Sequence, residues 1–336
     1  MTSQLPVPND ILEIAFAFRR SKTLLTAVEL GVFSALTKQS RTAKSLAQHL
    51  GLHGRGAEDF FDALVALGLI RRDAAGLYSN TAAAARFLDP ESDDYVGHAL
   101  HRVSTRVYNN WNLLGMALRT GLPQSGAFGV GGYGALYSDA SSLETFLRAM
   151  TGTSLIYARA LAVTFQWGEY CSVIDIGTAE GCVPVQIARV HPHLVVSGFD
   201  LPSVEPSFTS YVRRNALPHL QFYSGDFLND PLPSADVLVM GRILHNWSLP
   251  IKQMLLSKAY ASLPRGGALI ICETLIDDAR QNAPDALFAS LHMLIETPEG
   301  YEATGAEYDG WLRNSGFRSV RILQLGCAQS AIVGIK

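Results

Sequence analysis

The sequence contains few cysteines, no excess of basic residues and no long apolar run. Its cysteines, Cys171, Cys182, Cys272 and Cys327, form no CxxC pair, which argues against a thiolate zinc site or a disulfide framework. The 27 basic residues are outnumbered by 30 acidic ones, so phosphate neutralisation does not favour a nucleic-acid partner. No run approaches the roughly 18 apolar residues of a membrane span, and the N-terminus lacks the pattern of a secretory signal. We therefore expect a cytoplasmic protein with no membrane partner.

The chain is long enough for two domains. Its 336 residues are 48% apolar and 17% charged, which is ample material for a sizeable core. The spacing of apolar residues changes along the chain: it is typical of helices in the first part and of short apolar strands in the second. We predict a helical, winged-helix-like domain at residues 1–104 and an α/β catalytic domain at 105–336, which begins with a helical linker.

The first domain follows the order helix, turn, helix and small hairpin of a winged helix. Its expected recognition helix carries Glu58, Asp59 and Asp62, and these acidic side chains would repel DNA phosphates. A folding or dimerisation module is therefore favoured, and a DNA-binding regulator is the weaker alternative. The predicted helices span residues 11–18, 23–36, 41–52 and 57–67, and the two predicted strands span 68–73 and 76–79.

The second domain reads as a parallel sheet covered by helices on both faces. Near-continuous apolar strands separated by helical stretches indicate this arrangement. Two closely spaced C-terminal runs are too near for a helical crossover and should pair as an antiparallel hairpin at the sheet edge. The predicted strands are 172–176, 195–199, 220–223, 236–240, 268–272, 320–325 and 330–335. Before them come a helix at 107–118, a glycine-rich loop at 126–134, and helix from 142 to about 164.

Acidic loops follow three successive strands of this sheet. The stretch from Asp175 to Gly181 has glycines for a tight turn but not the G-x-G-x-x-G spacing, and Glu180 there would repel a pyrophosphate. Asp200 could bind ribose hydroxyls, and Asp226 could bind an adenine amino group beside Phe227. These loops should meet at the carboxyl edge of the sheet, so they indicate an adenosine-containing cofactor without a phosphate chain.

At this point the sequence resembles a known enzyme family along nearly all of its length. The motifs Phe199-Asp200-Leu201-Pro202, Gly225-Asp226-Phe227, Ile243-Leu244-His245-Asn246-Trp247 and Gly300-Tyr301-Glu302-Ala303-Thr304 carry the resemblance. The family is that of class I S-adenosylmethionine-dependent O-methyltransferases of the caffeic-acid, acetylserotonin and antibiotic-tailoring type. The first loop departs from the family's D-x-G-G-G-x-G at Thr178, Ala179 and Glu180. The resemblance implies cofactor contacts at Asp175, Gly177, Asp200, Leu201, Asp226, Phe227 and Arg242.

The resemblance also implies the catalytic residues. In the family, the histidine of this motif is the general base, which is His245 here, and two glutamates that match Glu273 and Glu302 bracket it. Asn246 replaces the usual aspartate and carries no charge. An imidazole can take the proton of a hydroxyl while the methyl group is transferred in line, and no metal is needed.

The acceptor is less well defined by the sequence. Positions that match the family's acceptor pocket are aromatic residues, methionines and a histidine, which suit a flat aromatic or heteroaromatic hydroxyl compound such as a polyketide, phenazine or pyrrole-type intermediate. N- or C-methylation, or decarboxylation or hydroxylation on the same scaffold, are the alternatives. A homodimer is expected through the N-terminal helices. The predicted acceptor residues are Trp111, Phe146, Met150, His292 and Met293.

Overall fold

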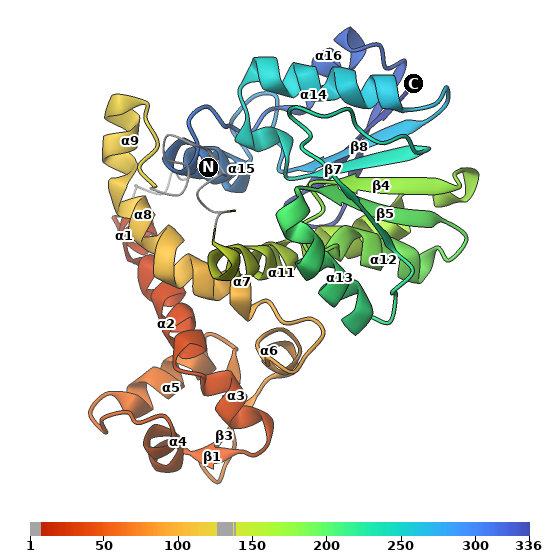
Figure 1. The fold of residues 1–336 in the computed structure, drawn as a ribbon. Helices are drawn as coiled ribbons and strands as arrows, with labels where there is room; N and C mark the ends of the chain where they lie inside the picture. The colour runs from red at the N-terminus through yellow and green to blue at the C-terminus, as the bar shows by residue number, and fades with distance from the viewer. Residues whose placement is uncertain (1–7, 126–136, 138) are drawn as a thin grey trace, which may run out of the picture. The chain divides into compact units, whose positions relative to one another are not determined.

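The computed structural model describes residues 8–125, 137 and 139–336, which form two compact units, Met1–Tyr108 and Asn109–Lys336 (Figure 1). The glycine-rich loop predicted at 126–134 lies outside the described residues. None of the described helices is long and apolar enough to cross a membrane.

The first unit packs short helices against a small antiparallel sheet. Phe33, Phe61, Leu64 and Tyr78 are fully buried at its centre. Thr42 caps the fourth helix, because its side chain accepts a hydrogen bond from the Ser45 amide. The helices are α1 (Asn9–Phe16), α2 (Phe18–Glu29), α3 (Val32–Thr37), α4 (Ala43–His49), α5 (Ala57–Ala66), α6 (Ala82–Phe87) and α7 (Gly97–Arg102), followed by a π-helical turn, η1 (Val103–Val107).

The small sheet has three strands, so the two-stranded hairpin prediction was incomplete. The order is β1 (Arg41–Thr42), β3 (Leu77–Asn80), β2 (Ile70–Arg72), and all neighbours are antiparallel. Arg41 and Thr42 were predicted to begin a helix. They pair instead with Tyr78 and Leu77, since a two-residue strand has no periodicity that a sequence could reveal.

The acidic side chains of α5 are engaged within the unit. Arg72 on β2 lies 3.2 Å from an Asp62 carboxylate oxygen and 3.4 Å from Glu58. The hydroxyl of Tyr78 donates a 2.6 Å hydrogen bond to Asp62, and burial raises the pKa of Tyr78 to about 12. These acids therefore tie the helix to the hairpin.

The apolar stripes of the N-terminal helices, at residues 11–18 and 24–36, differ in exposure. Most apolar residues of α2 and α3, including Leu25 and Leu36, are buried in the unit's own core. By contrast, α1 has no buried residue, and Ile14 is 80% exposed. Folding within the unit therefore already covers the stripe at residues 24–36, whereas the stripe on α1 stays exposed.

The second unit is built on a seven-stranded sheet in the order β6-β5-β4-β7-β8-β10-β9. The first five strands of that order are parallel, and β10 and β9 add antiparallel at one edge, as the sequence predicted. The strands are β4 (Ser172–Ile176), β5 (Val195–Asp200), β6 (Gln221–Ser224), β7 (Val237–Gly241), β8 (Ala268–Glu273), β9 (Ser319–Gln324) and β10 (Ser330–Ile335).

Helices cover both faces of this sheet, so the parallel strands are apolar on both sides. Helices α11, α12 and α13 share one core with the sheet, and α14 and α16 share the other (Figure 1). These helices and α15 are α11 (Ala140–Thr164), α12 (Cys182–Val190), α13 (Glu205–Arg214), α14 (Leu249–Ser262), α15 (Pro284–Glu296) and α16 (Gly305–Asn314). Short 3₁₀ turns occur at η4 (Trp167–Glu169), η5 (Pro202–Val204) and η6 (Leu244–Asn246).

The central parallel strands bring candidate functional residues to one edge of the sheet. β4, β5, β7 and β8 are parallel, so their carboxyl ends, at Ile176, Asp200, Gly241 and Glu273, lie along the same edge. Antiparallel β10 returns beside β8, and its Ser330 is the register partner of Glu273. The fold thus brings the loops that follow these strands together, as open α/β sheets do for their ligands.

The segment predicted as a helix at 107–118 is helical throughout but not one regular α-helix. The chain there changes from η1 to α8 (Tyr108–Asn110), then to a 3₁₀ turn, η2 (Trp111–Leu113), and to α9 (Leu114–Thr120). Asn110 uses its side chain in a tertiary hydrogen bond, donating to Glu296 at 2.8 Å. Asparagine competes with regular helix in this way, because its side chain finds other partners.

Candidate active site

A buried histidine bracketed by two carboxylates lies just past β7. His245, on η6, is 5% exposed. Its Nδ1 lies 2.7 Å from Oε1 of Glu302 and 3.3 Å from Oε2 of Glu273, and its backbone amide donates to Glu273 at 3.2 Å. An ionised carboxylate only accepts, so this network assigns the proton to Nδ1. The lone pair of Nε2 is then the one that can serve a substrate.

The charges of Glu273 and Glu302 determine the direction of the pKa shift of His245. Burial lowers the pKa of His245, but the charges of Glu273 and Glu302 outweigh it, and the net shift is upward. Burial raises the pKa of Glu273 to about 7, against the opposing charge of His245. The carboxylates therefore stabilise an imidazolium, as the acidic partner of a catalytic histidine does.

The loop that carries Glu302 is fixed against the histidine's backbone. The Tyr301 amide donates to the His245 carbonyl at 2.8 Å. A Cβ on Gly300 would lie 2.6 Å from that same carbonyl oxygen, so only glycine fits. The motif of residues 300–304 thus positions Glu302 through main-chain contact.

A buried lysine on α14 supports the same loop, and the sequence analysis missed it. Lys252 is fully buried, and its Nζ donates to the Tyr301 carbonyl at 2.9 Å. Burial lowers the pKa of Lys252 to about 8, although the charges of Glu273 and Glu302 act in the opposite direction. A lysine within a helix normally reads as solvated, so the sequence carried no signal for this role.

The first loop turns sharply beside β4. Gly177 has φ +72°, and a Cβ there would lie 2.3 Å from Cδ1 of Ile243. Ala179 has φ +51°, where the resemblance would have placed glycine. The Ala179 amide donates to Asp200 at 2.9 Å, so the carboxylate that ends β5 also holds this loop. The backbone conformation at Gly177 therefore favours glycine, and a Cβ there would also have to displace the Ile243 side chain.

Two buried carboxyl groups lie at the ends of β4 and β5. Asp200 accepts hydrogen bonds from the Ala179 and Leu201 amides, the latter at 2.8 Å. Burial raises the pKa of Asp200 to about 6 and that of Asp175 to about 8. A carboxylate has about four acceptor positions, so Asp200 keeps capacity for ligand hydroxyls beside the two amides.

Glu180 is turned into internal contacts. Its carboxylate accepts a 2.7 Å hydrogen bond from Thr151 on α11 and lies 3.7 Å from Arg214 on α13. Burial raises the pKa of Glu180 despite these partners. The side chain therefore links the first loop to two helices, a structural role that the sequence analysis did not foresee.

The remaining predicted cofactor residues, Asp226, Phe227 and Arg242, each have a defined contact within the unit. Asp226 accepts hydrogen bonds from the Leu228 amide and the Asn229 side chain, at 2.9 and 2.7 Å. Phe227 packs edge-to-face on Trp247, with ring centroids 6.0 Å apart. Arg242 has φ +57° and donates to Thr153 on α11.

The predicted acceptor residues fall on three elements. Phe146 and Met150 lie one turn apart on α11, and Phe146 packs against the same small buried cluster as Ala179 of the first loop. His292 is half-buried and Met293 is buried on α15, which packs against η2, the turn that carries Trp111. Phe146 and Met150 therefore belong to the side near the first loop, and the other three residues to the side near α15.

The group formed by His245, Glu273 and Glu302 also has the composition of a metal site. Ligand atoms of His245, Glu273 and Glu302 lie within 4.8 Å of one another. However, Nδ1 of the histidine is already hydrogen-bonded at 2.7 Å to Glu302, and a metal would have to displace that proton. The arrangement fits an acid–base group better than a metal centre.

Comparison with known proteins agrees with this geometry. The O-methyltransferase domain family matches residues 111–318, and the O-methyltransferase dimerisation domain family matches residues 12–90. The tetracenomycin polyketide synthesis 8-O-methyl transferase TcmO of Streptomyces glaucescens is 38% identical over 333 residues, which cover 98% of this chain and 97% of that protein. The N,N-dimethyltransferase OxyT of Streptomyces rimosus is 34% identical, with 92% and 90% covered.

A solved structure shows the same fold. Human N-acetylserotonin methyltransferase, crystallised in complex with SAM, superposes with a TM-score of 0.90 at 26% identity, and the match covers 100% of this chain and 99% of the human one. The likeness covers both units of the chain. The chain belongs to the family of O-methyltransferases that carry an N-terminal dimerisation domain.

Proposed function

We propose that this O-methyltransferase moves a methyl group from S-adenosylmethionine to a hydroxyl of a small aromatic or heteroaromatic compound and releases S-adenosylhomocysteine. The observation that carries the proposal is the buried His245, hydrogen-bonded at 2.7 Å to Glu302 at the carboxyl edge of the sheet. A hydroxyl acceptor needs a base, because a phenol with a pKa of about 10 is mostly neutral at pH 7.

The residues at the edge suit this cofactor. Asp200 offers carboxylate oxygens at the end of β5, and Asp175 lies buried at the end of β4. Such acceptors match ribose hydroxyls and a cationic group, whereas they would repel a phosphate chain. When bound, S-adenosylmethionine supplies an electrophilic methyl group on a sulfonium whose sulfur leaves with the bonding electrons. We assign Asp175, Gly177, Asp200, Leu201, Asp226, Phe227 and Arg242 to its site.

His245 is assigned as the general base. As the acceptor oxygen forms its bond to the methyl carbon, the hydroxyl proton passes to Nε2, and Nδ1–H remains bonded to Glu302. The two carboxylates, Glu273 and Glu302, hold the tautomer and stabilise the imidazolium that forms. General-base catalysis of this kind contributes roughly 100- to 10,000-fold.

The acceptor is proposed to be a flat hydroxylated secondary metabolite. Its supports are the TcmO relative, named for polyketide synthesis, and the aromatic and sulfur-containing side chains at the predicted positions. Trp111, Phe146, Met150, His292 and Met293 are assigned to its pocket. The same relative supports antibiotic-type aromatic metabolites as the class of acceptor.

N-methylation is the second candidate, favoured by the 34% identity to the N,N-dimethyltransferase OxyT. An amine acceptor carries its own lone pair and has less need of a base. His245→Ala therefore separates the two: O-methylation should fall by roughly 100-fold or more, while N-methylation should be largely retained. Mass spectrometry of products from matched phenol and aniline acceptors would measure both.

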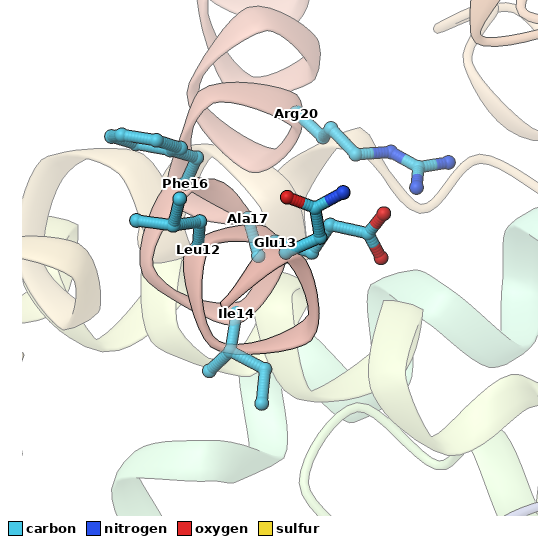
Figure 2. A pocket seen from close by; sticks show the side chains of 7 residues that line it. Leu12, Glu13, Ile14, Phe16, Ala17 and Arg20 are labelled. Carbon is cyan, nitrogen blue, oxygen red and sulfur yellow. The ribbon is translucent and has the colours of Figure 1, made fainter. Parts of the chain in front are cut away.

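The first unit is proposed to form a homodimer through α1. Its exposed apolar side chains surround a surface hollow, and Figure 2 shows Leu12 and Phe16 on one side of the helix, with Glu13 and Arg20 on the other. Apolar faces of this kind mark association sites. We expect a dimer mass by light scattering and a monomer mass for Ile14→Glu. A monomer mass for the native chain would overturn this assignment.

A further inference from the structure

Lys252 is a buried cation that the reaction scheme does not use. It is 0% exposed, and lysines are almost never fully buried unless they are paired. Its Nζ lies 3.2 Å from the centroid of the Tyr301 ring and 5.4 Å from that of Trp311. Attraction to ring faces and a hydrogen bond to a carbonyl both favour the charged ammonium.

The same ammonium is hydrogen-bonded to Tyr301, the residue that precedes Glu302 in the chain. It donates to the carbonyl of Tyr301, whose carbon is bonded to the amide nitrogen of Glu302. The Tyr301 amide in turn donates to the His245 carbonyl. Lys252 therefore fixes the short segment that holds Glu302 against the imidazole.

The site also holds two buried carboxyl groups beside a single imidazole. Within the part of the chain that the structure describes, Oε2 of Glu302 and Oε2 of Glu273 have no hydrogen-bond partner, and neither does the buried hydroxyl of Tyr308. One imidazole cannot neutralise two carboxylates. The charged or titratable groups that interact with one or both of these carboxyl groups are His245, Arg242, Lys252, Cys272 and Tyr308, and Glu307 interacts with Lys252 and Tyr308.

We propose that Lys252 is a positioning residue that keeps His245 available as a base at neutral pH, by holding the Tyr301–Glu302 segment and by offsetting the charge of the two buried carboxylates. This inference rests on the proposed function. With both carboxylates ionised, Lys252 charged and His245 neutral, the group carries a net charge of −1. Proton transfer to His245 brings it to zero.

The sign of the effect follows from Coulomb's law. Without the Lys252 ammonium, the group formed by His245, Glu273 and Glu302 is more negative in every protonation state. His245 therefore keeps its proton to a higher pH. His245 would then be protonated, and inactive as a base, at a pH where the native enzyme works. We expect the acidic limb of the pH profile of kcat/KM to move up by about one pH unit in Lys252→Met.

The experiment compares three variants with the native enzyme. Lys252→Met removes the charge and keeps the volume, and Lys252→Arg keeps the charge. Lys336→Met is the matched control, because Lys336 also lies over a tyrosine ring, at 4.5 Å from the Tyr260 centroid, and donates to main-chain carbonyls away from His245. The limb should move up in Lys252→Met, stay near its native position in Lys252→Arg, and remain unchanged in Lys336→Met.

A second readout needs no turnover. The imidazole resonances of His245, assigned by their loss in His245→Asn, are titrated in the ligand-free protein, and their midpoint should rise in Lys252→Met as the kinetic limb does. An unmoved midpoint in folded Lys252→Met, or an equal rise in Lys336→Met, would overturn the inference. If native enzyme methylates only amines while the midpoint still rises, the proposed function fails and the role of Lys252 stands.

Discussion

The replacement Glu302→Gln tests the electrostatic role of the carboxylate most directly. Glutamine has nearly the same shape, and its amide oxygen can still accept the bond from Nδ1 that Glu302 now accepts at 2.7 Å. The change therefore removes a buried charge while it preserves the tautomer of His245. What is lost is the attraction between the carboxylate and the imidazolium.

The expected size follows from that contact. An opposite charge at such a distance shifts a pKa by about one to three units, so His245, whose pKa is now raised, should titrate at least about one unit lower. The acidic limb of kcat/KM moves down, the direction opposite to that expected for Lys252→Met. A charge-assisted hydrogen bond contributes about 1.5–3 kcal/mol, so kcat should fall about 10- to 100-fold on the plateau.

The assay is a pH series of initial rates with a phenolic acceptor, followed as S-adenosylhomocysteine release. Glu299→Gln is the matched control, because Glu299 is exposed in the same loop. Affinity for S-adenosylmethionine, measured by calorimetry, should change little in either variant. A limb that stays in place or moves up in Glu302→Gln would refute the assigned role of the carboxylate.

Three further predictions concern the cofactor edge. Gly177→Ala should lower the melting temperature and weaken S-adenosylmethionine binding, because its Cβ would lie 2.3 Å from Ile243. Gly266→Ala is the control for backbone strain alone, because Gly266 has φ +84° but open space around it. Equal effects of the two substitutions would contradict the crowding argument. Asp200→Ala should raise the calorimetric Kd by about tenfold or more, and an unchanged Kd would remove Asp200 from the site. Burial raises the pKa of Asp175 from 3.8 to about 8, so its contribution to stability is full below the unfolded pKa and is lost as pH rises through the folded one. Asp175→Asn should therefore flatten the fall in unfolding free energy between about pH 4 and about pH 8, and an unaltered slope would count against this assignment.

The sequence predicted the sheet well because its central strands are buried on both faces. Residues 172–176 and 330–335 were placed at their observed bounds, and the other strands differ by a residue at either end. Continuous apolar runs give a strong signal of this kind. The pairing of β1 and the broken helix around residues 103–113 depend on tertiary contacts, such as the Asn110–Glu296 hydrogen bond, which have no local signature.

The candidate site was predictable where loops follow strands. His245, Glu273 and Glu302 were named from motifs, and the fold brings them within hydrogen-bond or ion-pair distance. Lys252 and the Thr151–Glu180 contact were missed, because both join side chains from helices to loops distant in sequence. Their assigned roles remain predictions.

The pairing of Ser330 with Glu273 has a consequence for biosynthesis. A nascent chain that ends just after β8 contains Glu273 but not β10, the strand that pairs with it. This edge of the sheet is therefore incomplete until β10 has been translated. Premature termination before Ser330 should therefore yield a product in which Glu273 lacks its strand partner, and ribosome-bound chains should show no methyl transfer until translation has passed that strand.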